Sequence, residues 1–106
     1  MQGITSVNNK KQFEEMLSMN KKTVVDFNAS WCGSCKTMKP VFDKLAHQNK
    51  DVAFLSVDVD ENSDIAQEYG IKSMPTFKFI SDGEVVDEVV GANRKNLEST
   101  MTSFAG

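Results

Sequence analysis

The sequence is poor in the residues that crosslink small domains or bind metals. It contains two cysteines, Cys32 and Cys35, and a single histidine, His47. A zinc ion usually needs four cysteine or histidine ligands, so we expect no metal site. A disulfide between Cys32 and Cys35 would close a very short loop, and the stabilisation from a crosslink grows with loop length. A reactive role therefore explains this cysteine pair better than a structural crosslink does.

Positive charge and long apolar runs are scarce as well. The 12 Lys and Arg residues are outnumbered by 15 Asp and Glu residues, and the net charge of −3 argues against nucleic acid or an anionic membrane as a partner. No apolar run reaches the roughly 20 residues of a membrane-spanning helix. Residues 1–9 lack the charged start and apolar core of a secretory signal. With cysteines confined to a redox-type motif, this favours the reducing cytoplasm, or the nucleus, as the location.

The length predicts a single domain over residues 1–106, large enough to bury a core without disulfides or metals. Apolar periodicity and turn residues predict five strands and four helices. The strands are expected at 4–7, 23–28, 52–58, 76–80 and 84–90, and the helices after Asn9, from about 36 to 47, at 65–69 and after Asn93. Strands that alternate with helices pair in parallel, whereas a final hairpin at Asp82-Gly83 is antiparallel. The expected fold is α/β, a mixed five-stranded sheet flanked by four helices in the order β-α-β-α-β-α-β-β-α.

Several residues predict where the helices begin and end. Asn9 is expected to cap the first helix, with Gln12 in the capping-box position. Asn93 is expected to cap the last helix, and Gly70 suits the end of the third. Pro40 lies inside the helix expected from about 36 to 47, so this helix should be kinked or broken there.

The two cysteines lie between an apolar, β-branched strand and this helix. Cys32 should therefore be near a helix N-terminus, where free N–H groups and the helix dipole stabilise a thiolate, the reactive form of cysteine. Cys35 follows one turn later on the same face and can attack a mixed disulfide on Cys32, which releases the partner. We expect Cys32 to be the exposed attacking thiol and Cys35 the resolving thiol tucked beneath it.

Other residues near the pair allow two interpretations each. Asp26 lies in an apolar strand, so it either faces solvent at an edge or is buried with a raised pKa. Trp31, the only tryptophan, belongs either to the core or to a contact surface beside the thiol. Gly91 and Ala92 either leave room for a partner strand or form a simple turn.

The chain resembles the thioredoxin family over nearly its whole length, and it resembles cytosolic animal-type members most of all. The matching residues are Val25–Phe27, Trp31–Gly33, Cys35–Lys36, Lys39–Pro40, Asp58–Asp60, Met74–Phe77, Gly83 and Gly91–Asn93. Ser34 departs from the family motif, which usually has proline there. A serine donor near Cys32 would favour its thiolate and predicts a less reducing pair. The additional cysteines of many animal relatives are absent, which argues against a disulfide-linked dimer.

The resemblance implies a thioredoxin fold and roles for particular residues. Asp26 would be buried beneath Cys35 as its proton acceptor, with Lys39 as a nearby cation. The bond between Met74 and Pro75 would be cis, with Pro75 packed against the redox disulfide Cys32–Cys35. Partners would bind a surface made of Trp31, Met74, Pro75, Gly91 and Ala92, with Gly33 and Ser34 supporting the active-site turn.

The resemblance also implies an activity, that of a general protein-disulfide reductase, active as a monomer. Electrons would come from NADPH through a thioredoxin reductase, and the chain itself binds no cofactor because it lacks a glycine-rich dinucleotide fingerprint. Expected partners are peroxiredoxins, ribonucleotide reductase and methionine sulfoxide reductases. A redox-controlled binding module on the same fold is the alternative. A glutaredoxin is disfavoured because Cys32–Cys35 lacks that family's Pro-Tyr.

Overall fold

The chain folds in the predicted order of strands and helices. The computed structural model describes residues 3–106. Its elements are β1 (Ile4–Ser6), α1 (Lys10–Met19), β2 (Lys22–Asn28), α2 (Gly33–Gln48), β3 (Ala53–Asp58), α3 (Ser63–Glu68), β4 (Thr76–Ser81), β5 (Glu84–Val90) and α4 (Arg94–Ala105). The largest difference from the prediction is at α2, which begins at Gly33 instead of about residue 36. Cys35 is therefore inside the first turn of the helix.

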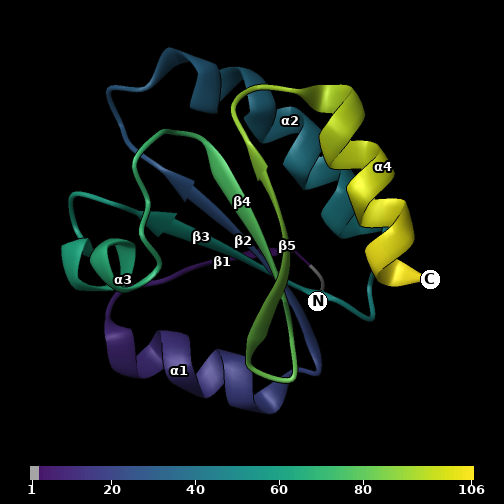
Figure 1. Ribbon diagram of the computed structural model, residues 1–106, viewed down its shortest axis with the longest axis horizontal. Helices are drawn as coiled ribbons and strands as arrows, with labels where there is room; N and C mark the ends of the chain where they lie inside the picture. Colours follow the sequence, from purple (N-terminus) through teal and green to yellow (C-terminus); the bar gives the residue numbers. More distant parts are fainter. Residues whose placement is uncertain (1–2) are drawn as a thin grey trace.

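The predicted mixed five-stranded sheet is confirmed, with the strands in the order β1-β3-β2-β4-β5. β3 pairs in parallel with β1 and β2, whereas β4 pairs antiparallel with β2 and β5. Helices α1 and α3 cover one face of the sheet, and α2 and α4 cover the other (Figure 1). The middle strand β2 has both faces covered, and Val24, Val25 and Phe27 have no exposed surface. β2 leads directly into the turn that carries the cysteines.

The predicted caps are present, with one change in their hydrogen bonds. The Asn9 side chain accepts a hydrogen bond from the Gln12 N–H at 2.8 Å. The Gln12 side chain accepts from the Asn8 N–H at 2.7 Å, one residue earlier than in a regular capping box. The Asn93 side chain caps α4 by accepting from the Asn96 N–H at 3.0 Å. These bonds satisfy N–H groups that a helix start leaves without partners.

Pro40 does not break its helix, because α2 runs without interruption from Gly33 to Gln48. Of the two outcomes that the sequence allowed, a break is therefore excluded. The hairpin turn was predicted correctly: Asp82 and Gly83 have φ angles of 51° and 84°. Both central residues of a type I′ turn need positive φ, which suits Asp-Gly.

β5 forms one edge of the sheet and exposes several valines. Val85, Val86 and Val90 are 45%, 56% and 52% exposed. Between and beside them are the acidic residues Glu84, Asp87 and Glu88, all of them exposed. Within residues 3–106, no helix is long and apolar enough to cross a membrane.

Candidate active site

Cys32 and Cys35 form a disulfide at the start of α2, with their Cα atoms 5.3 Å apart. Cys32 is the N-cap residue of α2 and has an extended backbone. Its sulfur accepts a hydrogen bond from the Cys35 N–H at 3.1 Å. The N-cap position and this donor both favour a negative charge on the Cys32 sulfur, as the position between strand and helix predicted.

Exposure does not distinguish the two cysteines as we expected. Cys32 is 6% exposed and Cys35 is 7% exposed, so the prediction of an open Cys32 above a covered Cys35 is wrong for the disulfide form. The reason is a small apolar cluster that both cysteines form with Ala29, with Val59 and Met74 packed against it. What differs is the surroundings: Cys32 caps the helix, whereas Cys35 lines a cavity that it shares with Asp26.

Ser34 brings a hydroxyl group close to the Cys32 sulfur. The Ser34 Oγ lies 3.4 Å from the Cys32 Sγ. The main-chain donor to this sulfur is the Cys35 N–H, and the hydrogen bond from Ser34 is made by its hydroxyl. Gly33 is exposed, and an added Cβ atom there would meet nothing within 4 Å. Space alone therefore does not require glycine at this position.

Asp26 is buried, which decides between the two positions that the sequence allowed. Its residue is 7% exposed, and the Oδ1 atom of its carboxyl has no hydrogen-bond partner within residues 3–106. Burial raises the pKa of Asp26 from 3.8 to about 7. The Asn28 amide and the positive charge of Lys39 act against this shift of the pKa, whereas Asp43 adds to it. A carboxyl group with such a pKa can both accept and release a proton near neutral pH.

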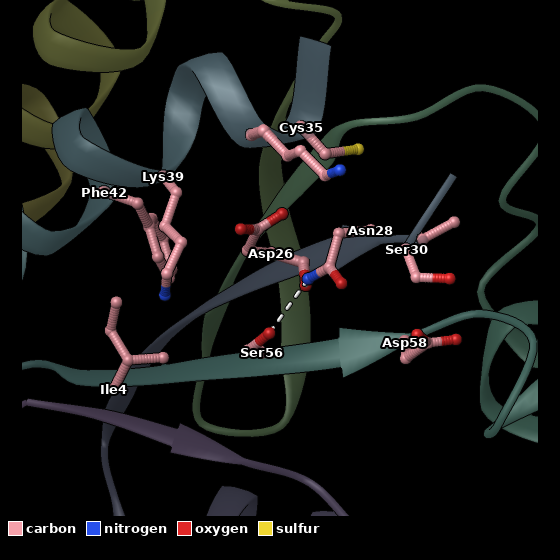
Figure 2. A pocket seen from close by; sticks show the side chains of 11 residues that line it. Ile4, Asp26, Asn28, Ser30, Cys35, Lys39, Phe42, Ser56 and Asp58 are labelled. Carbon is pink, nitrogen blue, oxygen red and sulfur yellow. Dashed lines mark hydrogen bonds between the residues drawn. The ribbon is translucent and has the colours of Figure 1, made fainter. Parts of the chain in front are cut away.

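The cavity beside Asp26 has a volume of about 310 Å³. The Asp26 carboxyl lies between α2, which carries Cys35, and β3, which carries Ser56 (Figure 2). Lys39 lines the same cavity, but its amine points toward Ile4 in this view. In the part of the chain that the structure describes, no ion pair within 4.0 Å joins Lys39 to Asp26. Lys39 therefore acts on Asp26 through its charge and not through a direct contact.

Sequence reasoning missed two polar residues beside Asp26. The Asn28 amide nitrogen donates to the main-chain carbonyl of Asp26 at 3.0 Å and to the Ser56 Oγ at 2.9 Å. The period of two along β2 puts Asn28 on the same face as Asp26, and this was the available signal. Ser56 could not be found from sequence alone, because its position depends on the register between β2 and β3, in which it pairs with Asp26.

Trp31 is 67% exposed, so its assignment to the core is excluded. The indole N–H donates to the Asp60 Oδ2 at 2.9 Å, which fixes the ring beside the disulfide. Asp60 was predicted only to belong to a segment that resembles the family, and no contact with Trp31 was predicted for it. Its position just after β3 was the available signal, because the carboxyl ends of parallel strands meet at one edge of the sheet.

The loop before β4 contacts the cluster formed by the cysteines through Met74, and the loop after β5 contacts Pro75. The peptide bond between Met74 and Pro75 is cis, as the family resemblance implied. The Gly91 N–H donates to the Pro75 carbonyl at 2.7 Å, and Gly91 has a φ of 92°, which favours glycine. Ala92 follows and is exposed. The loop residues singled out from the sequence are therefore held next to one another.

The arrangement of possible metal ligands can be described for residues 3–106. Among residues 3–106, no group of three or more His, Cys, Asp and Glu side chains is arranged to hold an ion. His47 is on the exposed surface of α2, with its Nδ1 atom 3.0 Å from the Asp43 carbonyl oxygen.

The fold and the cysteine pair together define a class of protein. A cysteine pair at the junction of a buried strand and a helix, with one sulfur at the helix N-terminus, suits reversible dithiol–disulfide exchange. The protein is a thiol–disulfide oxidoreductase.

Comparison with known proteins gives the family. A family model described as Thioredoxin matches residues 4–103. Thioredoxin of Rattus norvegicus is 46% identical over 101 residues, which cover 93% of this chain and 96% of the rat protein. The structure of Malassezia sympodialis thioredoxin has a TM-score of 0.93 at 40% identity and covers 100% of this chain and 94% of its own. A chain from work on thiol resolution in a yeast mitochondrial 1-Cys peroxiredoxin, through the glutathione and thioredoxin systems, has a TM-score of 0.89 at 40% identity, with 94% of each chain covered. The chain belongs to the thioredoxin family and reduces protein disulfides by dithiol–disulfide exchange.

Proposed function

We propose that Cys32 is the attacking thiol and Cys35 the resolving thiol of this reductase. In the first step the Cys32 thiolate attacks a disulfide of the partner protein, forms a mixed disulfide and releases one partner thiolate. In the second step Cys35 loses its proton and attacks the Cys32 sulfur, which forms the Cys32–Cys35 disulfide and releases the second partner thiolate. The released thiolates take up protons, and two electrons pass from the cysteine pair to the partner.

The observation that carries this assignment is the hydrogen bond from the Cys35 N–H to the Cys32 sulfur at 3.1 Å. It stabilises a thiolate at Cys32, where α2 begins, and gives Cys35 no equivalent advantage. Cys35 instead shares a cavity with the buried Asp26. Asp26 acts as the proton acceptor of Cys35 in the second step, and the charge of Lys39 favours the ionised form of Asp26.

The partner surface consists of Trp31 on one side of the disulfide and Met74, Pro75, Gly91 and Ala92 on the other. Exposure of Trp31 supports this, because an exposed aromatic ring held in place by a hydrogen bond is typical of protein contact surfaces. An extended segment of the partner would pair with the main chain next to Pro75.

Membership of the thioredoxin family supports a proposal for the electron source and the partners. The protein, a single-domain monomer in the cytoplasm, receives electrons from NADPH through a thioredoxin reductase. It passes them to disulfides of peroxiredoxins, ribonucleotide reductase and methionine sulfoxide reductases. The similar chain from work on a yeast mitochondrial 1-Cys peroxiredoxin supports a peroxiredoxin as one partner.

Reduction of insulin disulfides in the presence of NADPH and a thioredoxin reductase tests this function. We expect repeated turnover, with NADPH consumed in proportion to the disulfides reduced and far in excess of the protein present. A variant with Cys32→Ser is the control and should consume none. Binding of partners without turnover would favour the alternative, a redox-controlled binding module.

Replacing Ser34 with proline should make the protein more reducing. The Ser34 hydroxyl, 3.4 Å from the Cys32 sulfur, stabilises the thiolate and hence the dithiol form. Loss of one hydrogen bond of roughly 1 kcal/mol corresponds to a decrease of about 20 mV for a two-electron couple. Equilibration of both proteins with a glutathione redox buffer measures the difference, and Ser34→Ala separates loss of the hydroxyl from stiffening by proline. An equal or higher potential in Ser34→Pro would contradict the role given to the hydroxyl.

A further inference from the structure

Asn28 lines the same cavity as Asp26 and Ser56, and the mechanism proposed above gives it no role. Both N–H groups of its amide are used, one by the Asp26 main-chain carbonyl and one by the Ser56 hydroxyl. The amide is therefore fixed between β2 and β3. Its nitrogen, the positive end of the amide dipole, is on the side of Asp26 and Ser56 (Figure 2).

A negative charge on the buried Asp26 carboxyl is stabilised by a nearby group that carries partial positive charge. Its Oδ1 atom is buried without a hydrogen bond within residues 3–106, and a buried charge without compensation is costly. The charged groups around it are few: Lys36, Lys39 and Asp43 on α2 and Asp58 at the end of β3. The paired position on β4 is Phe77, which cannot ionise. The Asn28 amide is the strongest of the effects that oppose burial in setting the Asp26 pKa, ahead of the charge of Lys39.

We propose that Asn28, anchored by Ser56, is a positioning residue that eases ionisation of Asp26 and so sets the pH range in which Cys35 can give up its proton. The inference rests on the proposed role of Asp26 in the second step. In that step the Cys35 proton moves to the Asp26 carboxylate, and Asp26 must return it to solvent before the next turnover. Without the amide, Asp26 would keep its proton up to a higher pH and would be unable to accept another.

Ser56 acts through Asn28. The register of β2 and β3 puts Ser56 directly opposite Asp26, and its hydroxyl accepts the second N–H of Asn28. That bond leaves the hydroxyl hydrogen of Ser56 available for a second acceptor within the same cavity. Loss of the hydroxyl should free the Asn28 amide to rotate, which weakens its effect on Asp26 without removing it.

The test uses Asn28→Leu, which keeps a similar volume and removes both donors. Titration of the Asp26 carboxyl, followed by carbon-13 NMR in the full protein, should move to higher pH. Adduct release by Cys35 at pH 6.5 should slow about tenfold, which is the loss of ionised Asp26 at that pH if its pKa rises by about one, with much less change at pH 9. Asn20→Leu is the matched control, because the Asn20 amide also donates to a main-chain carbonyl, that of Met16 at 2.8 Å, far from this cavity.

Ser56→Ala and the double variant complete the test. Ser56→Ala should shift the Asp26 titration in the same direction by less, and the double variant should equal Asn28→Leu alone, because the two residues act as one unit. If Asn28→Leu does not fold, the shift in Ser56→Ala decides. An unchanged Asp26 titration in the folded variants, or an equal shift in Asn20→Leu, overturns the proposal. A shifted titration with an unshifted rate profile would instead contradict the catalytic role of Asp26.

Discussion

Replacing Cys35 with serine should convert the protein into a trap for its partners, whereas replacing Cys32 with serine should leave it inert. In Cys35→Ser, Cys32 still attacks the partner, but no second thiol releases the mixed disulfide. The substitution keeps the main-chain N–H that donates to the Cys32 sulfur at 3.1 Å, so the attacking thiolate stays stabilised. Turnover should fall to background in both variants, and only Cys35→Ser should accumulate a covalent adduct.

Non-reducing electrophoresis and intact-mass spectrometry measure these adducts. The two variants serve as controls for each other, because each has one thiol of the same pair in the same fold. Adducts should disappear on addition of a reductant such as dithiothreitol. Accumulation on Cys32→Ser, or on neither variant, would show that the roles of the two cysteines are assigned wrongly.

Replacing Asp26 with asparagine should slow the second step and stabilise the fold at the same time. Removal of a positioned proton acceptor should slow release of the mixed disulfide at pH 7 by roughly a hundredfold. The fold gains because the buried carboxyl no longer has to ionise. A pKa raised from 3.8 to about 7 corresponds to at most about 4 kcal/mol, since each tenfold change is about 1.4 kcal/mol.

The gain in stability should depend on pH in a particular direction. Between pH 4 and 7 the folded protein holds the Asp26 proton and the unfolded chain does not, so the stability of the parent falls as the pH rises from about 4 to about 7. Asp26→Asn lacks this loss. Its advantage in the free energy of unfolding should be small near pH 3.5, grow toward pH 7 and then level off. Urea unfolding at several pH values measures it, and a gain that is constant from pH 4 to 9 would falsify the assignment.

The sequence predicted the elements and the redox pair well, because both depend on local patterns. Apolar periodicity, the Asp82-Gly83 turn and the Asn93 cap act within a few residues of the chain. The exposure of Cys32 was predicted wrongly because Cys32 belongs to a buried cluster against which Met74, far along the chain, packs. Burial of Asp26 could not be decided from the strand alone, and the partners of Trp31 and Asn28 come from β3 and the loop after it. Such contacts depend on strand register and loop packing, which local patterns do not specify.

The exposed valines of β5 make this edge of the sheet prone to pairing with another strand, and the acidic residues beside them oppose such pairing. β-branched residues on an edge strand favour pairing with another chain, which is how many proteins aggregate. Glu88 is paired with Lys78 on β4, but a second copy brought against β5 would bring Glu84 and Asp87 near acidic residues of its own β5, and the repulsion opposes that pairing. The acidic side chains of β5 thus disfavour pairing between two copies of this chain along this edge of the sheet.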